Sequence, residues 1–436
     1  MTLLTTCFVL ALTTGTLTAA FSPAGAPQGG GCAVASATSR GMPCGNAMLT
    51  STLPVLGTTM TLTVAGIGPS IPGVLFHSPD TGTSFPFSGC DIYLSELNTA
   101  AYFTTGASGA ADIPAGVPAA PSLCGAQLIV QAVAFTGTGP VTSLGLAVSN
   151  AIALRVGATP PSGGTFPANW IHGSANCSTN TDPPIQVHAY SPRTWILRQN
   201  ACLNFEKPFM YLLAGNTRAL LIDTGATASA SLFPLRVTVQ GLLDAYELAN
   251  NLPNLQLIVA HSHGHGDHVQ GDGQFLGQPN TTVVGTSISA LQAFFGITTW
   301  PTQTVSYDLG GRTVDIVPTP GHHSAHITIY DRETGAMFSG DTLYPGFLFV
   351  SNLTAYKASI DRLVGFANSN PITDVLGGHI EMTSSLGVAY PYGTVYQPNE
   401  HTLPLGVSHL LELDSALDSI FGSSTNVHDH FIIQVF

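Results

Sequence analysis

The pattern of apolar and polar positions divides the chain into two parts. Between residues 30 and 156, alternating runs such as TMTLTVAGI, QLIVQAVAF and SLGLAVSNAIALRV predict short β-strands, and clusters rich in Gly, Pro, Asp and Ser separate them. Short strands in succession, without helical patterns between them, are typical of an antiparallel sandwich. We therefore predict a small all-β sandwich, an accessory domain, over residues 30–156, followed by a Pro- and Gly-rich linker over residues 157–183.

From residue 184 onward, strand and helix patterns alternate. Strand patterns occur at residues 185–200, 209–226, 255–260, 281–287, 314–321, 326–331, 336–343, 374–379 and 430–436. Helical patterns occur between them at residues 242–252, 288–297, 356–370 and 406–421. Such alternation predicts sheets covered by helices, and hence an α/β domain over residues 184–436.

Composition narrows the classes of function. Charged residues make up only 8% of the 436 residues, and the chain contains 47 Gly and 30 Pro, a composition that suits an exported protein. Lys and Arg number 11 against 24 Asp and Glu, which gives a formal net charge of -13. This charge repels phosphate backbones and leaves no basic stripe, so we expect no nucleic-acid partner.

The first 26 residues read as a secretory signal peptide. An apolar stretch from Leu3 to Ala20 is followed by small residues that suit cleavage near Ala20 or Ala26. No Lys or Arg precedes the apolar stretch, which departs from the usual signal pattern. An uncleaved membrane anchor is the alternative, because the stretch is near the lower length limit for spanning a bilayer. We expect a secreted, periplasmic or cell-surface protein with no stable membrane insertion after cleavage, and we predict no particular oligomeric state.

The cysteines agree with export. Removal of Cys7 with the signal would leave an even number of cysteines, which predicts disulfides in an oxidising compartment. Sequential pairing would keep each loop local, and it joins Cys32 to Cys44, Cys90 to Cys124 and Cys177 to Cys202. A zinc site built from these cysteines is the alternative, but the chain contains no C-x-x-C motif.

A histidine cluster follows the apolar run at residues 255–260. Residues 261–272 read HSHGHGDHVQGD, in which His263 and His265 are two apart and can hold one metal ion. Asp267 and His268 follow in the next turn and can hold a second. The intervening glycines favour a tight loop over a flexible His-rich tract. Taken alone, the cluster also allows a structural zinc site.

Four further polar residues follow predicted strands, each beside glycine. They are Asp223 in LLIDTGA, His322 in TPGHHSAH, Asp341 in FSGDTLYPG and His379 in LGGHIEM. With the H-x-H-x-D-H pattern of His263, His265, Asp267 and His268, these motifs make residues 184–436 resemble the metallo-β-lactamase-fold hydrolases. The resemblance implies an αββα sandwich of two sheets between helical layers.

The resemblance also implies a set of metal ligands. His263, His265 and His322 would bind a first metal ion, Asp267, His268 and His379 a second, and Asp341 would bridge the two. Two Zn²⁺ ions are expected because imidazole and carboxylate ligands suit zinc, with iron or manganese as alternatives. Asp223 would steady the metal-binding loop through hydrogen bonds, and simple turn chemistry is the other interpretation. His261, His323 and His326 flank the ligand positions without matching the pattern, so we expect them to support or pack beside the site.

The function implied is hydrolysis of a small-molecule acyl substrate. A hydroxide shared by two zinc ions would attack an ester, lactone or thioester, and Asp267 would orient it and then pass a proton to the leaving group. The motifs are most similar to the glyoxalase II and lactonase-like branches. The alternatives are a phosphodiesterase or nuclease on the same scaffold, a β-lactamase, or a binding protein with a relic metal site.

Substrate contacts are harder to identify from the sequence. Tyr344 stands three residues after Asp341, and resemblance to lactonases implies that its hydroxyl contacts the substrate carbonyl, whereas an aromatic core residue is the alternative. Residues 390–405 follow the last predicted ligand and are dense in aromatic and polar side chains. Tyr392, Tyr396 and His401 are therefore candidate pocket residues, unless this segment is a surface loop packed by its own side chains.

Overall fold

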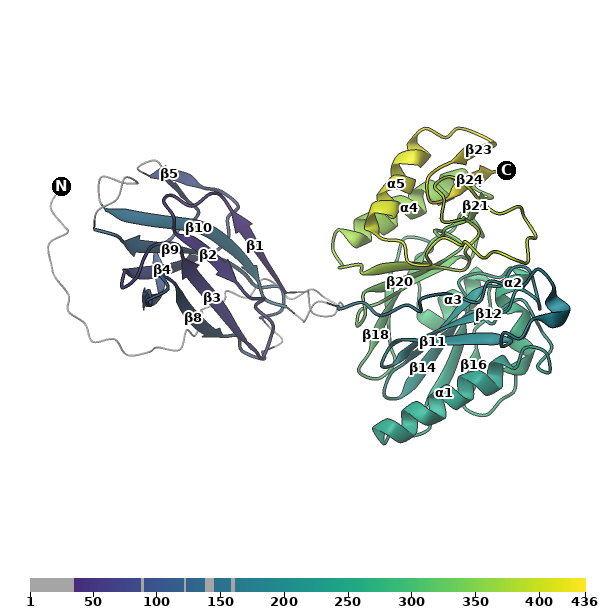
Figure 1. Cartoon of the computed structure of the whole chain (residues 1–436). Helices are drawn as coiled ribbons and strands as arrows, with labels where there is room; N and C mark the ends of the chain where they lie inside the picture. The colour runs from purple at the N-terminus through teal and green to yellow at the C-terminus, as the bar shows by residue number, and fades with distance from the viewer. Residues whose placement is uncertain (1–34, 88–89, 121–122, 138–144, 158–160) are drawn as a thin grey trace. The chain divides into compact units, whose positions relative to one another are not determined.

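The structure, a computed structural model, describes residues 35–87, 90–120, 123–137, 145–157 and 161–436 (Figure 1). The chain divides into two compact units, residues 1–160 and 161–436. The predicted signal peptide, Cys7 and Cys32 lie outside the described residues. Within the described ranges, none of the helices combines the length and the apolar character needed to cross a bilayer.

The N-terminal unit is all-β. Its strands are β1 (Ser36–Arg40), β2 (Met48–Ser51), β3 (Thr59–Ala65), β4 (Pro72–Ser78), β5 (Phe85–Phe87), β6 (Cys90–Ile92), β7 (Asn98–Thr104), β8 (Ala111–Gly116), β9 (Gln127–Phe135) and β10 (Leu146–Arg155). A sheet ordered β1-β10-β9-β4-β7 and a smaller sheet ordered β2-β3-β8 share one apolar core. Every second residue of β3 is buried, as expected for a strand with one face on a core. The alternating pattern therefore predicted this part of the chain correctly.

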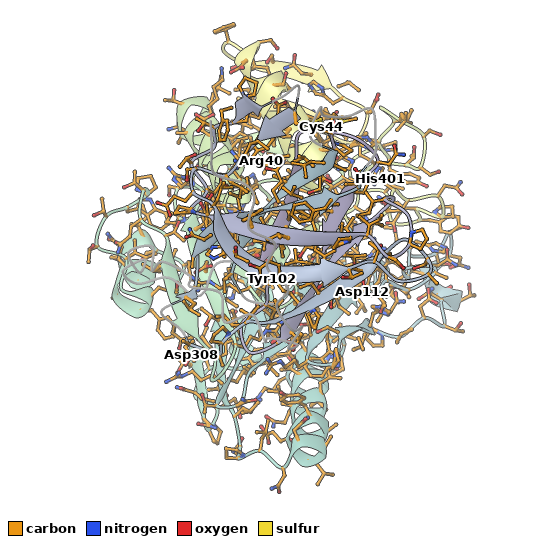
Figure 2. All side chains as sticks on the ribbon, turned by 90° about the vertical axis from the view of Figure 1, so that its left-hand side faces the viewer. Arg40, Cys44, Tyr102, Asp112, Asp308 and His401 are labelled. Carbon is orange, nitrogen blue, oxygen red and sulfur yellow. A yellow bond between two sulfur atoms is a disulfide. The ribbon has the colours of Figure 1, made fainter. Side chains whose placement is uncertain are left out.

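The disulfides differ in part from sequential pairing. Cys44, labelled in Figure 2, is bonded to Cys90 across 46 residues, so the predicted Cys32–Cys44 and Cys90–Cys124 pairs are wrong. Cys44 forms an isolated bridge with Val148 of β10, and β6 carries Cys90 against the same sheet. The fold thus brings together cysteines that a rule of shortest loops keeps apart. The predicted Cys177–Cys202 pair is present.

The C-terminal unit contains two larger sheets. Its first half comprises η2 (Cys177–Thr179), β11 (Ile185–Ser191), β12 (Thr194–Gln199), β13 (Phe209–Ala214), β14 (Arg218–Ile222), α1 (Leu235–Asn250), β15 (Gln256–Ala260), α2 (Gly266–Val269), η3 (Gln270–Gln274), β16 (Thr281–Val283) and α3 (Ile288–Phe295). Its second half comprises β17 (Val305–Asp308), β18 (Thr313–Pro318), β19 (Ile327–Asp331), β20 (Ala336–Gly340), β21 (Phe347–Val350), α4 (Leu353–Ala367), β22 (Asp374–Gly377), α5 (Val407–Asp418), β23 (Ser424–Val427) and β24 (Ile432–Val435).

These elements form four layers. A six-stranded sheet, β11-β12-β13-β14-β15-β16, packs against a five-stranded sheet, β17-β18-β19-β20-β22, across a central apolar core. Helix α1 covers the outer face of the first sheet, while α4 and α5 cover the outer face of the second (Figure 1). Strand β14 shows why the strands read as continuous apolar runs: Leu220 and Ile222 face the central core, and Leu221 faces α1. The αββα architecture expected from the resemblance is present.

Residues 161–183, predicted as part of a linker, pack against the C-terminal unit. The Gly163 amide donates to the Thr334 carbonyl, and the Thr165 amide donates to the Tyr190 carbonyl. Phe166 and Trp170 lie against the central core. A linker has little need of large aromatic residues, so these two residues are the feature of the sequence that indicates packing of this segment against the domain.

Candidate metal centre

The site lies where several strands end. Strands β14 and β15 are parallel, and so are β20 and β22 in the facing sheet. Asp223 directly follows β14, Asp341 directly follows β20, and His379 stands two residues after β22. Residues 261–268 leave β15, and His322 follows β18. The two sheets therefore direct their polar strand ends toward one place, a common location for ligand sites in α/β folds.

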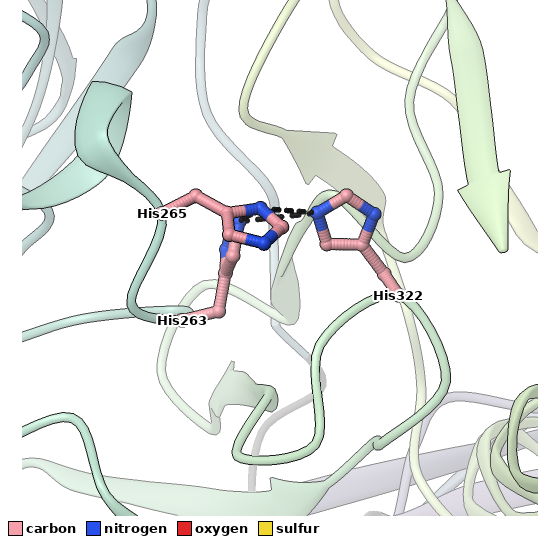
Figure 3. Close-up of side chains that lie close together, drawn as sticks. All are labelled: His263, His265 and His322. Carbon is pink, nitrogen blue, oxygen red and sulfur yellow. Dashed lines mark hydrogen bonds between the residues drawn. The ribbon is translucent and has the colours of Figure 1, made fainter. Parts of the chain in front are cut away.

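Seven side chains converge there in two groups, and we call them together the His–Asp cluster. They are His263, His265 and His322 in the first group and Asp267, His268, Asp341 and His379 in the second. In the first group, His265 Nδ1 lies 2.9 Å from His263 Nε2 and 2.9 Å from His322 Nε2 (Figure 3). In the second, Asp267 Oδ2 lies 3.2 Å from both His268 Nε2 and His379 Nε2. All seven predicted ligands are thus brought together.

Asp341 lies between the groups and faces both. Its Oδ1 is 3.3 Å from His268 Nε2 and 3.5 Å from His379 Nε2. Its Oδ2 is 3.6 Å from His322 Nε2 and 3.9 Å from His263 Nε2. One carboxylate therefore directs one oxygen to each group, which is the arrangement that a bridging ligand requires.

The outer ring nitrogens determine how the imidazoles are oriented. His268 Nδ1 donates to Asp223 Oδ2 at 2.8 Å, and His263 Nδ1 donates to Ser262 Oγ at 3.1 Å. The remaining two donate to backbone carbonyls, His322 Nδ1 to Phe349 and His379 Nδ1 to Glu206. With Nδ1 as the donor in all four, each Nε2 points into the cluster. Metal-binding histidines are commonly held in this way.

Asp223 connects the loop of residues 261–268, which we call the metal-binding loop because it carries four of the candidate ligands, to the six-stranded sheet. Besides His268, its carboxylate accepts hydrogen bonds from the Ser262 amide at 2.7 Å and from the Ser262 hydroxyl at 2.9 Å. Its backbone φ of 67° lies in the left-handed region, which Asp tolerates better than most residues. Asp223 thereby fixes the start of the loop and one ring of the cluster together.

The residues present fit metal ions. Among the described residues, Asp341 Oδ1 is a buried oxygen that accepts no hydrogen bond, although His268 Nε2 and His379 Nε2 lie within 3.5 Å of it. Nitrogen lone pairs that face one another at 2.9–3.3 Å repel unless a cation or a proton lies between them. Two ligand atoms roughly 2.1 Å from one tetrahedral Zn²⁺ are themselves roughly 3.4 Å apart. The imidazole and carboxylate set suits zinc, and these separations fit it.

The pKa shifts differ between the two groups of the cluster. Burial disfavours the charged forms of His268 and His379, but Asp341 and Asp267 outweigh it and raise the pKa of both imidazoles, that of His379 to about 9. A metal ion bound there would therefore displace protons.

The pKa values of His263 and Asp341 are shifted in the directions that metal binding needs. Burial, together with His268 and His326 nearby, lowers the pKa of His263 well below its ordinary value. Burial opposes ionisation of Asp341, but His268 and His379 outweigh it and hold the pKa of Asp341 below its ordinary value. At neutral pH the carboxylate is therefore ionised and His263 is neutral.

His326 supports the bridging residue from behind. The Asp341 amide donates to His326 Nε2 at 3.2 Å, so the other nitrogen, Nδ1, carries the proton and donates to Thr319 Oγ1 at 2.9 Å. The ring stacks on His263 with a centroid separation of 5.1 Å. His261 instead pairs with Asp272 at 2.8 Å. Neither histidine belongs to the cluster.

The other predicted contact residues lie at different places. Tyr344 is buried with its ring centroid 5.5 Å from that of His379, and its hydroxyl donates to the Phe347 carbonyl. Tyr392 is 66% exposed and donates to Glu206 Oε1, beside the carbonyl that holds His379. Tyr396 lies against His172, and His401 Nε2 lies 3.0 Å from His430 Nδ1. The recorded contacts of Tyr396 and His401 are therefore not with the cluster.

A groove of about 650 Å³ adjoins the first group, and we call it the α3 groove. Its lining residues are Gly264, Thr286, Ser287, Ile288, Ser289, Gln292, His323, Ser324 and Ala325. A Cβ at Gly264 would lie 3.0 Å from Thr286 Oγ1 and 3.6 Å from His323 Cε1. The glycine between His263 and His265 therefore lets the groove wall pack directly on the metal-binding loop. Sequence reasoning did not identify this groove, because separate polar residues with no motif form it.

Comparisons with known proteins agree with this site. Residues 203–379 match the model of a family described as the metallo-beta-lactamase superfamily, a range that contains Asp223 and the whole cluster. An acyl-coenzyme A thioesterase MBLAC2 from Gallus gallus is 36% identical over 17% of this chain and 28% of its own length. A hydroxyacylglutathione hydrolase from Synechococcus sp. (strain JA-2-3B'a(2-13)) is 31% identical over 33% of this chain.

The chain spans only part of these relatives, 56% of the length of the Synechococcus protein. A solved structure of a metallo-beta-lactamase from Pontibacter korlensis is also similar, with a TM-score of 0.36 and 18% identity. That similarity covers 54% of this chain and 100% of the other.

Proposed function

We propose that this chain, whose residues 203–379 belong to the metallo-β-lactamase superfamily, is a dinuclear zinc-dependent hydrolase of esters, lactones or thioesters. The observation that carries the proposal is the position of Asp341, with one carboxylate oxygen directed to each group of the cluster. The relatives named above, an acyl-coenzyme A thioesterase and a hydroxyacylglutathione hydrolase, support an acyl substrate.

Each group of the cluster would hold one metal ion. His263, His265 and His322 would bind the first, Asp267, His268 and His379 the second, and Asp341 would contact both. When bound, a pair of divalent ions polarises an acyl carbonyl and lowers the pKa of water toward neutrality. The remaining chemistry belongs to the side chains of this chain.

Asp267 is the candidate proton carrier. Its side chain is 21% exposed, whereas that of Asp341 is 7% exposed and enclosed by imidazoles. Asp267 is thus the carboxylate of the cluster that a leaving group and solvent can reach, as a general acid must be. His326 and Asp223 act through others, since they position Asp341 and His268 by hydrogen bonds.

The cysteines support an exported protein. Each unit contains a disulfide, Cys44–Cys90 in the first and Cys177–Cys202 in the second. Structural disulfides persist mainly in oxidising compartments. We therefore propose that the enzyme acts outside the cytosol.

Metal content and a substrate panel test the proposal. The purified chain should contain about two zinc ions, measured by elemental analysis, and should hydrolyse an ester, a lactone or a thioester but neither a β-lactam nor a phosphodiester. His263→Ala should lose metal and activity together. The matched change His323→Ala removes an imidazole beside the cluster and should keep the metal content. A zinc-supplemented protein that binds no metal, or that cleaves no acyl compound, would refute the function.

A further inference from the structure

We propose, on the basis of the hydrolase function above, that the α3 groove selects uncharged acyl substrates over those whose leaving group carries carboxylates or phosphates. The leaving groups of glutathione and coenzyme A thioesters are anionic. The inference therefore separates this chain from the substrates that its relatives are named for.

The lining of the groove carries polar groups without formal charge. None of its nine lining residues is Lys, Arg, Asp or Glu. The side chains of Thr286, Gln292 and Ser324 make no hydrogen bond to any described residue, so they are available to a ligand. Hydroxyl and amide groups of this kind suit carbonyl, ether and hydroxyl oxygens.

The cations of the C-terminal unit are occupied elsewhere. The chain has 11 Lys and Arg residues, of which Arg40 and Arg155 precede residue 161. Arg193, Arg198, Arg312 and Arg332 bind the carboxylates of Glu333, Glu400, Asp331 and Asp315. Arg218, Lys357 and Arg362 bind the backbone carbonyls of Asp308, Ile420 and Pro318, and Arg236 binds the Gln240 amide oxygen. None of these partners lines the groove.

The one remaining cation is not available to a substrate. Lys207 is 2% exposed and directly follows Glu206, whose backbone carbonyl accepts the hydrogen bond from His379 Nδ1. Proteins usually recognise carboxylates and phosphates through exposed Arg or Lys side chains. Within the described part of the C-terminal unit, the groove offers an anionic leaving group no such partner.

The net charge of the chain acts in the same direction. The whole chain has a formal net charge of -13. Such a field lowers the local concentration of anions and is screened by salt over about 8 Å at physiological ionic strength. Discrimination against anions should therefore weaken as salt is added.

The test compares one hydroxyacyl group on two thiols with the zinc-loaded full chain. The thioester of an uncharged thiol should have a kcat/KM about tenfold or more above that of the glutathione thioester at low ionic strength. The ratio should shrink as sodium chloride is raised, since the repulsion is electrostatic. Equal kcat/KM values for both thioesters would overturn the inference and leave the hydrolase function intact. Failure to hydrolyse either thioester or any lactone or ester would instead refute the hydrolase function.

A pair of variants locates the effect. Gln292→Arg places a cation in the groove and should shift the ratio about tenfold toward the glutathione thioester, mainly through KM. Gln278→Arg makes the same charge change just before β16, at the end of that strand opposite the metal-binding loop, and should leave the ratio unchanged. An equal shift in both variants would assign the effect to net charge and overturn the role of the groove. If Gln292→Arg fails to fold, the comparison of the two thioesters with the unaltered chain still tests the inference.

Discussion

The Asp223–His268 pair offers a sharp test of how the metal centre is held. In an Asp223→Asn variant, the amide oxygen can still accept a hydrogen bond from the Ser262 backbone N–H, whose nitrogen lies 2.7 Å from the present Oδ1. The amide nitrogen, however, replaces the Oδ2 that accepts His268 Nδ1–H at 2.8 Å, and a nitrogen bearing two protons cannot accept that bond. The variant thus removes the acceptor of His268 Nδ1–H, and it also removes the acceptor of the Ser262 hydroxyl, which donates to the same Oδ2 at 2.9 Å.

The expected loss of zinc affinity is worked out from the His268 contact, because His268 is the cluster residue that Asp223 bonds directly. A hydrogen bond to a charged group contributes about 1.5–3 kcal/mol, and the lost bond holds His268 in the tautomer that presents Nε2 to the cluster. Each 1.4 kcal/mol corresponds to about a tenfold change in binding. We therefore expect the zinc affinity to fall about 10- to 100-fold, the range seen for partners of metal-ligating histidines.

Competition against a chromogenic chelator measures this affinity. Asp272→Asn is the matched control, because Asp272 pairs with His261 at the same 2.8 Å distance but that histidine is outside the cluster. The control should keep its zinc affinity. An unchanged affinity in Asp223→Asn, or an equal loss in both variants, would show that the orientation of His268 is not what Asp223 provides.

Three further predictions concern the stability of the C-terminal unit. All three tryptophans lie in this unit, so tryptophan fluorescence can monitor its unfolding. Arg312→Ala leaves the fully buried Asp331 carboxylate unpaired and should cost about 3–5 kcal/mol in the free energy of unfolding, whereas a loss under about 1 kcal/mol would contradict the buried pair. Replacing Cys177 and Cys202 by Ser opens a loop of 25 residues and should cost about 3 kcal/mol, and equal denaturation midpoints before and after would contradict this. Burial, assisted by a neighbouring arginine, lowers the pKa of Lys207 to about 8 from 10.5, so the unfolded state binds more protons between these values. The stability of the native chain relative to Lys207→Met should therefore rise from pH 8 toward 10.5 and stay constant below 8, and parallel stability profiles would contradict this.

The sequence located the residues of the cluster better than the groups that orient them. The cluster residues follow strand ends beside glycines, so residue type and spacing both marked them. The groups that orient His322 and His379 are the backbone carbonyls of Phe349 and Glu206, and a carbonyl is present in every residue type. Strand β21, which supplies the Phe349 carbonyl, was not predicted.

The same distinction applies to the fold as a whole: local patterns predicted individual elements, but they did not predict contacts between distant segments. Alternation in β3 and the helical period in α4 identified elements whose burial depends on local pattern. The Cys44–Cys90 bond and the packing of residues 161–183 depend on which distant segments meet, and no short window of sequence contains that information.

The cluster draws its side chains from both sheets, with the loop after β15 on one side and the ends of β18, β20 and β22 on the other. Zinc held there would fasten the two layers to each other, since the sheets could not separate without releasing it. A ligand that binds only the native state at a hundred times its dissociation constant adds about 2.7 kcal/mol to stability. Resistance of this domain to proteolysis should therefore follow the zinc supply of its surroundings.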